Sequence, residues 1–177
     1  DTFFDRDAQL LARELLGKVI RHRVAGLWLS ARIIETDPDL EGMGTTITAI
    51  MRSRNKLFLA HIGDSRAYLL RDGTLSQLTT DHTFVQRLIE EGRLRPEEAE
   101  THPHRNVLMR VLGDVDASPE LEAEVYDAVV GERWLLCSDG LSDPVTRETI
   151  QIALGDGTPE MAANRLIELA LRSGGPD

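Results

Sequence analysis

Apolar side chains recur every three or four residues in several stretches of the chain, the spacing that places them on one face of an α-helix. In the first stretch they stand at Ala8, Leu11 and Leu15, and Gly17 closes the pattern. Thr158 followed by Pro159 is typical of a helix start, because threonine caps free N–H groups and proline suits the first turn. The spacing predicts helices over residues 7–16, 83–91, 146–154 and 158–171, and Pro96 predicts the start of a further short one.

Short apolar runs bounded by turn-forming residues predict strands between these helices. Asp72-Gly73 favours a tight hairpin, because both residues readily adopt positive φ. The predicted strands cover residues 19–20, 28–34, 45–50, 57–62, 67–70, 75–78, 121–130 and 134–138, and we expect the last two to pair with each other. Antiparallel strand pairs with helices grouped between them predict an α+β layered sandwich.

The composition is that of one acidic, soluble domain. The chain has 177 residues, with 20 Lys and Arg against 30 Asp and Glu and a formal charge of −10. Such a field disfavours nucleic acid and anionic membranes as partners. No apolar run in the given sequence has the length of a membrane span, and we expect no leader segment. A single cysteine, Cys137, excludes an internal disulfide, which fits a cytoplasmic location.

Three aspartates in tight polar turns are the candidate chemistry. Asp64 and Asp139 each follow a short apolar strand, and Asp177 ends a Gly-Gly-Pro-Asp sequence. Carboxylates that converge on one point repel each other unless a cation neutralises them, and Mg²⁺ and Mn²⁺ prefer carboxylate oxygens. The pattern favours a metal site, although Asp64 taken alone is more typical of a turn former and a terminal Asp177 is prone to fraying.

Four motifs stand in a specific order along the chain: Gly42-Met43-Gly44-Thr45-Thr46, residues 61–68, residues 135–143 and residues 174–177. In this order they resemble the bacterial, metal-dependent PPM family of serine/threonine protein phosphatases, nearest to the actinobacterial type. The resemblance implies two antiparallel sheets flanked by helices, with the metals at one end between the sheets. It implies that a metal-bound hydroxide attacks phosphorus, so that no catalytic protein nucleophile is needed.

The same resemblance implies roles for the three aspartates. Asp139 and Asp177 match ligands of the second catalytic metal, and Asp64 matches the ligand of a third metal. Residues 82–110 take the place of a mobile flap beside the active site. Cys137 is interpreted as a core residue, because a cysteine-dependent phosphatase needs an arginine six positions later and Asp143 stands there.

The chain also departs from the family pattern at both ends. The family's opening aspartate motif, its Asp-Gly-Met-Gly-Gly motif and its phosphate-binding arginine have no counterpart, and the family continues beyond Asp177. We therefore expect a domain, over about residues 41–177, that is truncated at both ends and lacks the bridging carboxylate. Missing strands expose apolar faces and unpaired edges, so we expect self-association.

Residues 1–36 carry a second resemblance. Phe3-Phe4-Asp5-Arg6, residues 11–20 and residues 31–36 resemble the opening of the alkyladenine (3-methyladenine) DNA glycosylases. That family continues with Glu-Ala-Tyr, where this chain has Asp37-Pro38-Asp39. Base excision needs a whole pocket for an extruded nucleotide, so we expect no glycosylase activity. The chain is interpreted as a chimera of a foreign segment at 1–36, with one helix and two strands, and the phosphatase-like domain at 41–177.

Two functions follow from these observations. The first is an Mn²⁺- or Mg²⁺-dependent phosphatase for phosphoserine and phosphothreonine proteins, impaired by the missing metal and phosphate ligands. The second is a catalytically inactive chimeric fold or metal-binding fragment. Manganese-dependent hydrolysis of an aryl phosphate discriminates between them.

Overall fold

The structure is a computed structural model that describes residues 19–24, 27–32, 45–111 and 122–174. Of the hairpin at 19–24 and 27–32 it describes the backbone. The predicted helix at 7–16 and the candidate ligand Asp177 lie outside the described residues.

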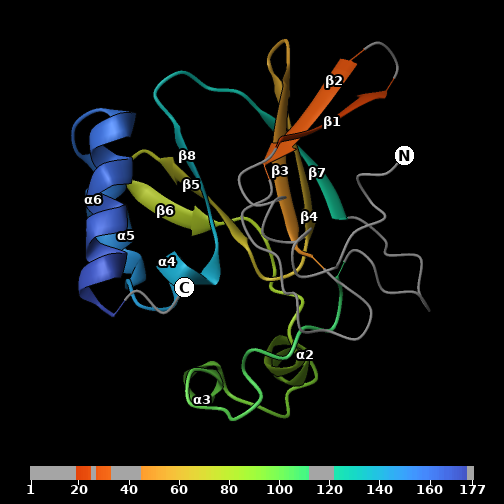
Figure 1. The fold of residues 1–177 in the computed structure, drawn as a ribbon, viewed down its shortest axis with the longest axis vertical. Helices are drawn as coiled ribbons and strands as arrows, with labels where there is room; N and C mark the ends of the chain where they lie inside the picture. The colour runs from red at the N-terminus through yellow and green to blue at the C-terminus, as the bar shows by residue number, and fades with distance from the viewer. Residues whose placement is uncertain (1–18, 25–26, 33–44, 112–121, 175–177) are drawn as a thin grey trace, which may run out of the picture.

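Two three-stranded antiparallel sheets form the centre of the molecule (Figure 1). The first has the order β3 (Ile47–Ser53), β4 (Lys56–Ile62), β7 (Glu122–Asp127). The second has the order β6 (Thr74–Gln77), β5 (Arg66–Arg71), β8 (Arg133–Cys137). A separate hairpin of β1 (Val19–Val24) and β2 (Leu27–Arg32) lies beside β3.

Helices cover one face of the second sheet and one end of the molecule. The helix α5 (Arg147–Gly155) packs on the second sheet, and α6 (Pro159–Arg172) packs on α5 and on α4 (Asp139–Ser142), which follows β8 after Ser138 (Figure 1). The helices α2 (Phe84–Glu90) and α3 (Pro96–Ala99) lie apart, below both sheets. In the part of the chain that the structure describes, no helix combines the length and the apolar character needed to cross a membrane.

The main apolar core lies between the second sheet and its two helices. Its most buried members come from β5, β6, α5 and α6: Tyr68, Leu75, Ile150, Ala153, Ala162 and Leu166. Cys137 belongs to the same cluster and is 8% exposed, which confirms its interpretation as a core residue. Burial raises the pKa of its thiol to about 12.

The predictions that depend on only a few neighbouring residues, a hairpin turn and three helix starts, are confirmed. Asp72 and Gly73 both have positive φ, at 49° and 76°, as the Asp-Gly hairpin requires. The hydroxyls of Thr83, Thr146 and Thr158 each accept a hydrogen bond from a backbone N–H three residues later, so all three predicted helix starts are correct. The expected mixture of helices and antiparallel sheets is also confirmed.

The predicted pairing of the strands at 121–130 and 134–138 is wrong. Strand β7 pairs with β4 and strand β8 pairs with β5, so the two belong to different sheets. The strand ends at Asp127, and Gly131, at φ 95°, lies in the turn that carries the chain from one sheet to the other. Tyr126 and Trp134 do meet, but as rings 5.4 Å apart in edge contact between the sheets.

One apolar row bears on the expected self-association. Phe58 of β4 lies between Met51 of β3 and Val125 of β7 in register, and Phe58 and Val125 are 36% and 57% exposed. Alternation along β7 places this row opposite Tyr126, on the face away from the second sheet. We expect Val125→Lys to shift the protein toward monomer, because a charge interrupts the apolar surface.

Sedimentation velocity over a concentration series measures this shift. The equally exposed Val129 lies outside the strand, so Val129→Lys is the matched control and should leave the association unchanged. A wild-type protein that stays monomeric at high concentration would contradict the prediction.

Candidate functional site

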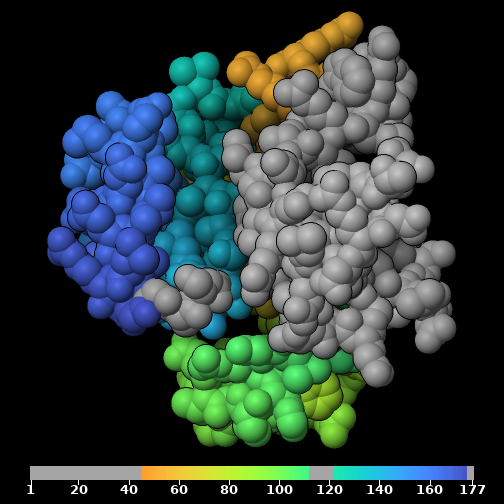
Figure 2. All heavy atoms as spheres, in the orientation of Figure 1, coloured from red at the N-terminus to blue at the C-terminus, as the bar shows by residue number. Residues whose placement is uncertain are grey.

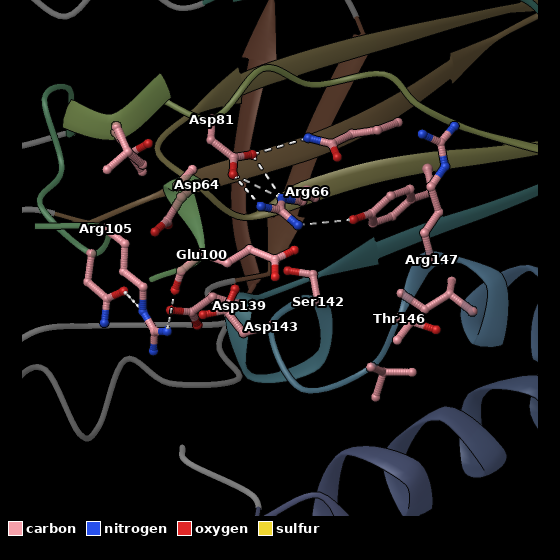
Figure 3. Close-up of a pocket in the computed structure, with 18 of the residues that line it drawn as sticks. Asp64, Arg66, Asp81, Glu100, Arg105, Asp139, Ser142, Asp143, Thr146 and Arg147 are labelled. Carbon is pink, nitrogen blue, oxygen red and sulfur yellow. Dashed lines mark hydrogen bonds and ion pairs between the residues drawn. The ribbon is translucent and has the colours of Figure 1, made fainter. Parts of the chain in front are cut away.

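A cavity of about 750 Å³ opens beside the ends of β4 and β8 (Figure 3). Its walls come from the turn after β4, from α4 and from the segment between α3 and residue 106. The charged residues that line it are Asp64, Arg66, Asp81, Glu100, Arg105, Asp139, Asp143, Arg147 and Glu148. The structure thus brings Asp64 and Asp139, which are far apart along the chain, to one hollow.

Asp64 stands in a turn that buried polar side chains hold in place. The hydroxyls of Thr46 and Ser65 are 2.9 Å apart, and the Thr48 hydroxyl donates to the Ser65 carbonyl at 2.6 Å. Ser65 is fully buried, and Gly63 adopts a φ of 109°. Because both neighbours of Asp64 are fixed, its half-buried side chain is directed into the cavity.

Asp139 is the first residue of α4, directly after β8. Ser138 is the N-cap of this short helix, and the N–H of Asp143 donates to the Asp139 carbonyl at 2.8 Å. Asp143 therefore lies one helical turn beyond Asp139, and both side chains line the cavity. In Figure 3 the side chains of Asp64, Asp139 and Asp143 gather at one side of it.

Asp143 is the site residue that sequence reasoning missed. It stands in the same Ser-Asp-Gly-Leu-Ser-Asp stretch as Asp139, at the position where a cysteine-dependent enzyme would need an arginine. The four-residue spacing was the available signal, because it places both carboxylates on one side of a helical turn. That signal depends on α4, a single-turn helix that was not among the predicted elements.

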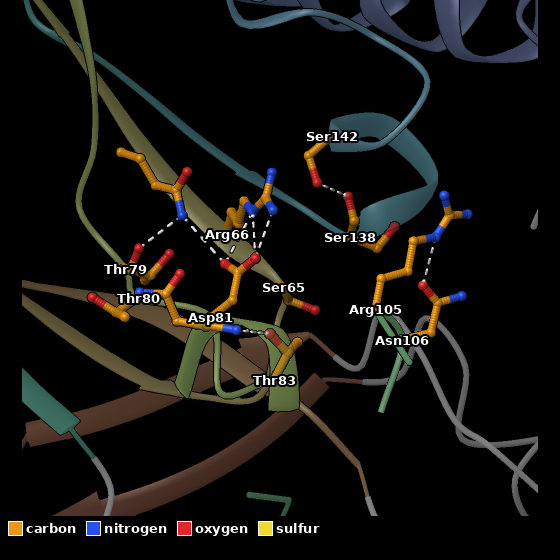
Figure 4. A network of polar contacts seen from close by, with 12 residues as sticks. Ser65, Arg66, Thr79, Thr80, Asp81, Thr83, Arg105, Asn106, Ser138 and Ser142 are labelled. Carbon is orange, nitrogen blue, oxygen red and sulfur yellow. Dashed lines mark hydrogen bonds and ion pairs between the residues drawn. The ribbon is translucent and has the colours of Figure 1, made fainter. Parts of the chain in front are cut away.

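An ion pair lines the same cavity close to Asp64 (Figure 4). The Arg66 guanidinium donates to both oxygens of Asp81, with Nη2 at 2.6 Å, and its Nη1 lies 3.4 Å from the Tyr68 hydroxyl. Burial alone would lower the pKa of Arg66, but the hydrogen bonds and charge of Asp81 outweigh it and raise that pKa above its usual range. Arg66 therefore offsets part of the repulsion that Asp81 exerts on the neighbouring Asp64 carboxylate.

The surroundings of Asp64 disfavour its charged form. Burial raises its pKa most, and the charges of Asp81 and Asp143 raise it further, while Arg66 acts in the opposite direction. A folded-state pKa above the unfolded value means that the free energy of unfolding falls as pH rises through the range where Asp64 ionises. A bound cation would relieve this repulsion.

We therefore expect Asp64→Asn to stabilise the metal-free protein by about 1 kcal/mol near neutral pH. The gain should disappear well below the ordinary aspartate pKa of 3.8, where wild-type Asp64 is itself neutral, and should reverse in excess Mn²⁺. Urea unfolding with EDTA and with Mn²⁺ measures both effects. Asp72→Asn, an exposed change in a turn that tolerates asparagine, is the control. Equal stability of both variants at every pH would contradict the prediction.

The segment predicted to be a flap lies beside the cavity. Its residues 84–110 form a distinct lobe at the lower end of the molecule in the space-filling view (Figure 2). Glu100, Arg105 and Asn106 of this segment line the cavity. Its mobility stays a prediction.

The described residues contain no group of three carboxylates, imidazoles or thiolates close enough to hold a metal ion by themselves. Asp64, Asp139 and Asp143 nevertheless supply oxygens to one hollow, which is the donor chemistry that Mn²⁺ and Mg²⁺ prefer. The ligand roles of Asp64, Asp139 and Asp177 stay predictions.

Comparison with protein families gives a direct match. The family described as "Protein phosphatase 2C" matches residues 30–177. The serine/threonine protein phosphatase PstP of Mycobacterium tuberculosis (strain H37Rv) is 56% identical over 166 residues, which are 93% of this chain and 32% of PstP. The serine/threonine phosphatase stp of Listeria monocytogenes (serovar 1/2a) is 38% identical over 144 residues, which are 81% of this chain and 57% of that protein.

Solved structures of phosphatases of this kind resemble the fold of this chain. The crystal structure of M. tuberculosis PstP/Ppp superposes with a TM-score of 0.73 at 58% identity, over 80% of this chain and 59% of that one. The PstP catalytic domain in complex with 2 manganese ions gives a TM-score of 0.70 at 56% identity, over 80% and 58%. This chain spans about a third of the length of PstP and less than two thirds of each solved chain. The predicted glycosylase-like origin of residues 1–36 stays a prediction.

Proposed function

We propose that this chain, which belongs to the protein phosphatase 2C family, hydrolyses phosphoserine and phosphothreonine in proteins with the help of Mn²⁺ or Mg²⁺. The observation that carries the proposal is the convergence of Asp64 and Asp139 on one cavity. The family resemblance predicted this convergence. The manganese ions named for the PstP catalytic domain support the choice of metal.

Asp64, Asp139 and Asp143 are the described residues that would supply carboxylate oxygens to the metal site, and we propose Asp177 as a further ligand. A divalent ion bound there would lower the pKa of water and neutralise the charge of the phosphoryl group. The protein then needs no nucleophile of its own. What its side chains add is metal placement, exclusion of bulk water and orientation of the phosphate.

Arg105 is the cation best placed to orient a phosphate. Of the three arginines in the cavity, Arg66 is paired with Asp81. Arg147 donates to the Leu75 carbonyl and lies on the side of the cavity away from Asp64 and Asp139 (Figure 3). Arg105 donates to two neutral oxygens, the Glu100 carbonyl and the Asn106 side chain. Its charge is therefore available to phosphate oxygens, which a guanidinium binds with two N–H groups at once.

We expect Arg105→Ala to raise KM for an aryl phosphate by about 10- to 100-fold, the worth of one hydrogen bond to a charged group. Steady-state kinetics in saturating Mn²⁺ measures this. Arg93→Ala is the matched control, because Arg93 lies in the same segment, is 69% exposed and pairs with Glu91 away from the cavity. Identical KM values for the two variants would contradict a phosphate contact by Arg105.

The test of the proposed function is hydrolysis of p-nitrophenyl phosphate and of a phosphothreonine peptide by the wild-type chain. The expected result is a rate that requires Mn²⁺ or Mg²⁺ and is lost in EDTA. If Mn²⁺ binds and neither substrate is hydrolysed, the second reading holds, and the chain is a metal-binding member of the family without activity. The same assay, run beside a longer member of the family, measures whether the hydrolysis rate of this chain is reduced as predicted. We also propose a cytoplasmic location for the chain.

A further inference from the structure

The end of the molecule opposite the cavity carries an exposed apolar loop. Strands β4 and β8 both run toward the cavity, so their first residues lie at the other end of the two sheets. The β3–β4 turn meets the β7–β8 loop there, because the Ala128 N–H donates to the Asn55 carbonyl at 2.8 Å. Residues 52–56 and 127–133 form this end, called the tip here. Its turn and loop lie at the top of Figure 1, with α2 and α3 at the bottom.

Two valines project from the tip. Val129 and Val130 are 54% and 102% exposed, so the second is as accessible as in an extended chain. The Val129 N–H donates to the Glu132 carboxylate at 3.4 Å, and Gly131, at φ 95°, turns the chain back into β8. The loop therefore presents a small convex apolar surface. Two side chains cannot supply the about 800 Å² that each partner of a stable protein interface buries.

Both carboxylates of the tip are paired with basic side chains. Asp127 lies 2.7 Å from the Lys56 ammonium group. Glu132 lies 2.5 Å from the Arg71 guanidinium, and its side chain is only 4% exposed. Neither carboxylate therefore presents an unpaired negative charge beside the two valines.

Two arginines of the tip carry positive charge without such a partner. Arg52 donates to the Arg54 carbonyl at 3.3 Å, and both side chains are exposed. Within the described part of the chain, neither guanidinium forms an ion pair. The net charge of −10 disfavours an anionic surface for the whole molecule, but salt screens exposed charges from one another beyond about 8 Å. A surface that touches the tip therefore meets mainly the two arginines.

We propose that the tip docks on an anionic lipid surface. Val129 and Val130 enter the boundary between headgroups and acyl chains, where peripheral proteins bury apolar side chains about 5–10 Å deep. Arg52 and Arg54 lie against the headgroups, whose negative potential attracts basic side chains within a Debye length. The seven residues of β4 place the cavity about 20 Å away, on the side that faces water. Docking of this kind does not depend on the proposed phosphatase activity.

Two kinds of substitution separate the apolar and the charged part of the contact. Val130→Ser should weaken partitioning onto vesicles that contain phosphatidylserine about 10-fold, because an apolar side chain no longer enters the bilayer. Arg52→Gln combined with Arg54→Asn should weaken it about 25-fold, since each basic residue near such a surface contributes about fivefold. Asparagine suits position 54, where φ is 55°.

Co-sedimentation with phosphatidylcholine vesicles, with and without phosphatidylserine and at low and high salt, is the measurement. Met161→Ser is the control for Val130→Ser, because Met161 is 61% exposed on α6, away from the tip. Arg93→Gln is the control for the arginines, because Arg93 is 69% exposed in the flap, at the opposite end. Both controls should bind as wild type does, and urea unfolding of each variant checks that the fold is unchanged.

A fluorescent label locates the contact on the molecule. The native Cys137 is buried, so an environment-sensitive dye reacts with an introduced cysteine instead. The emission of a dye at Val130→Cys should shift to the blue when phosphatidylserine vesicles are added. A dye at Met161→Cys should show no shift.

Binding that requires phosphatidylserine, falls with salt and is weakened by the tip variants alone would support the proposal. Equal binding of tip and control variants would overturn it, as would binding that ignores phosphatidylserine. A wild-type protein that stays in the supernatant would also overturn it, and an acidic protein surface would then be the better occupant for the tip. Hydrolysis of p-nitrophenyl phosphate is measured separately, so its failure leaves the vesicle result decisive.

Discussion

Asp139→Asn should reduce Mn²⁺-dependent hydrolysis by this chain more than about 100-fold, to the uncatalysed background. The loss of a partner that only supports a ligand already costs 10- to 100-fold, and Asp139 is proposed as a ligand itself. Asparagine has nearly the same shape, so the start of α4 and the packing of Cys137 behind it should persist. What disappears is the negative charge that binds a hard cation.

The control for this substitution is Asp127→Asn. Asp127 ends β7, is exposed and pairs with Lys56 at 2.7 Å, away from the cavity. The assay is hydrolysis of p-nitrophenyl phosphate with and without Mn²⁺, together with urea unfolding of both variants. An Asp139→Asn protein that is as active as Asp127→Asn would exclude Asp139 from the metal site. A rate that is equally low in wild type would instead refute the enzymatic reading.

The features of this fold that the sequence predicted correctly depend on interactions between residues only a few positions apart. Thr83, Thr146 and Thr158 cap helices because each hydroxyl meets an N–H only three residues away. The Asp72-Gly73 hairpin depends on two φ angles. Strand partners depend on distant segments, and the apolar run at 121–130 gave no indication that it would pair with β4 rather than β8.

The residues of the candidate site also include some that the sequence predicted and some that it did not. Asp64 and Asp139 were predictable because each closes an apolar strand within a motif that resembles a known family, and the structure does bring them to one cavity. Asp143 depends on the unpredicted α4. The two hydrogen bonds between His82 and Gly63 join positions 19 residues apart, which no local pattern specifies.

The turn before Asp64 packs closely against Thr46, just before β3, and a substitution of Gly63 tests how tightly. We expect Gly63→Ala to lower the free energy of unfolding by about 4 kcal/mol. Gly63 has φ 109°, which side chains rarely adopt, and this strain costs about 2 kcal/mol. An alanine Cβ there would also lie 2.4 Å from Thr46 Cγ2 and 3.1 Å from Thr46 Cα. Overpacking of this kind costs about 2 kcal/mol more.

Thr46 cannot easily yield to the new methyl group. It is 5% exposed, and its hydroxyl is held 2.9 Å from that of Ser65, which is fully buried. Any shift that relieves the clash therefore moves Ser65 and, with it, Asp64. For this reason Gly63→Ala should weaken Mn²⁺ binding as well as stability, and the two losses should appear together.

Gly73→Ala separates strain from crowding. Gly73 also has a positive φ, 76°, but an added Cβ would meet no atom within 4 Å, so only the strain of about 2 kcal/mol remains. Urea unfolding of both variants gives the difference, expected to be about 2 kcal/mol with an unchanged slope. Equal destabilisation would mean that Thr46 gives way freely. The Asp64 turn would then not be rigid. The orientation of the Asp64 carboxylate toward the cavity would have to be set by a bound metal ion rather than by the fold.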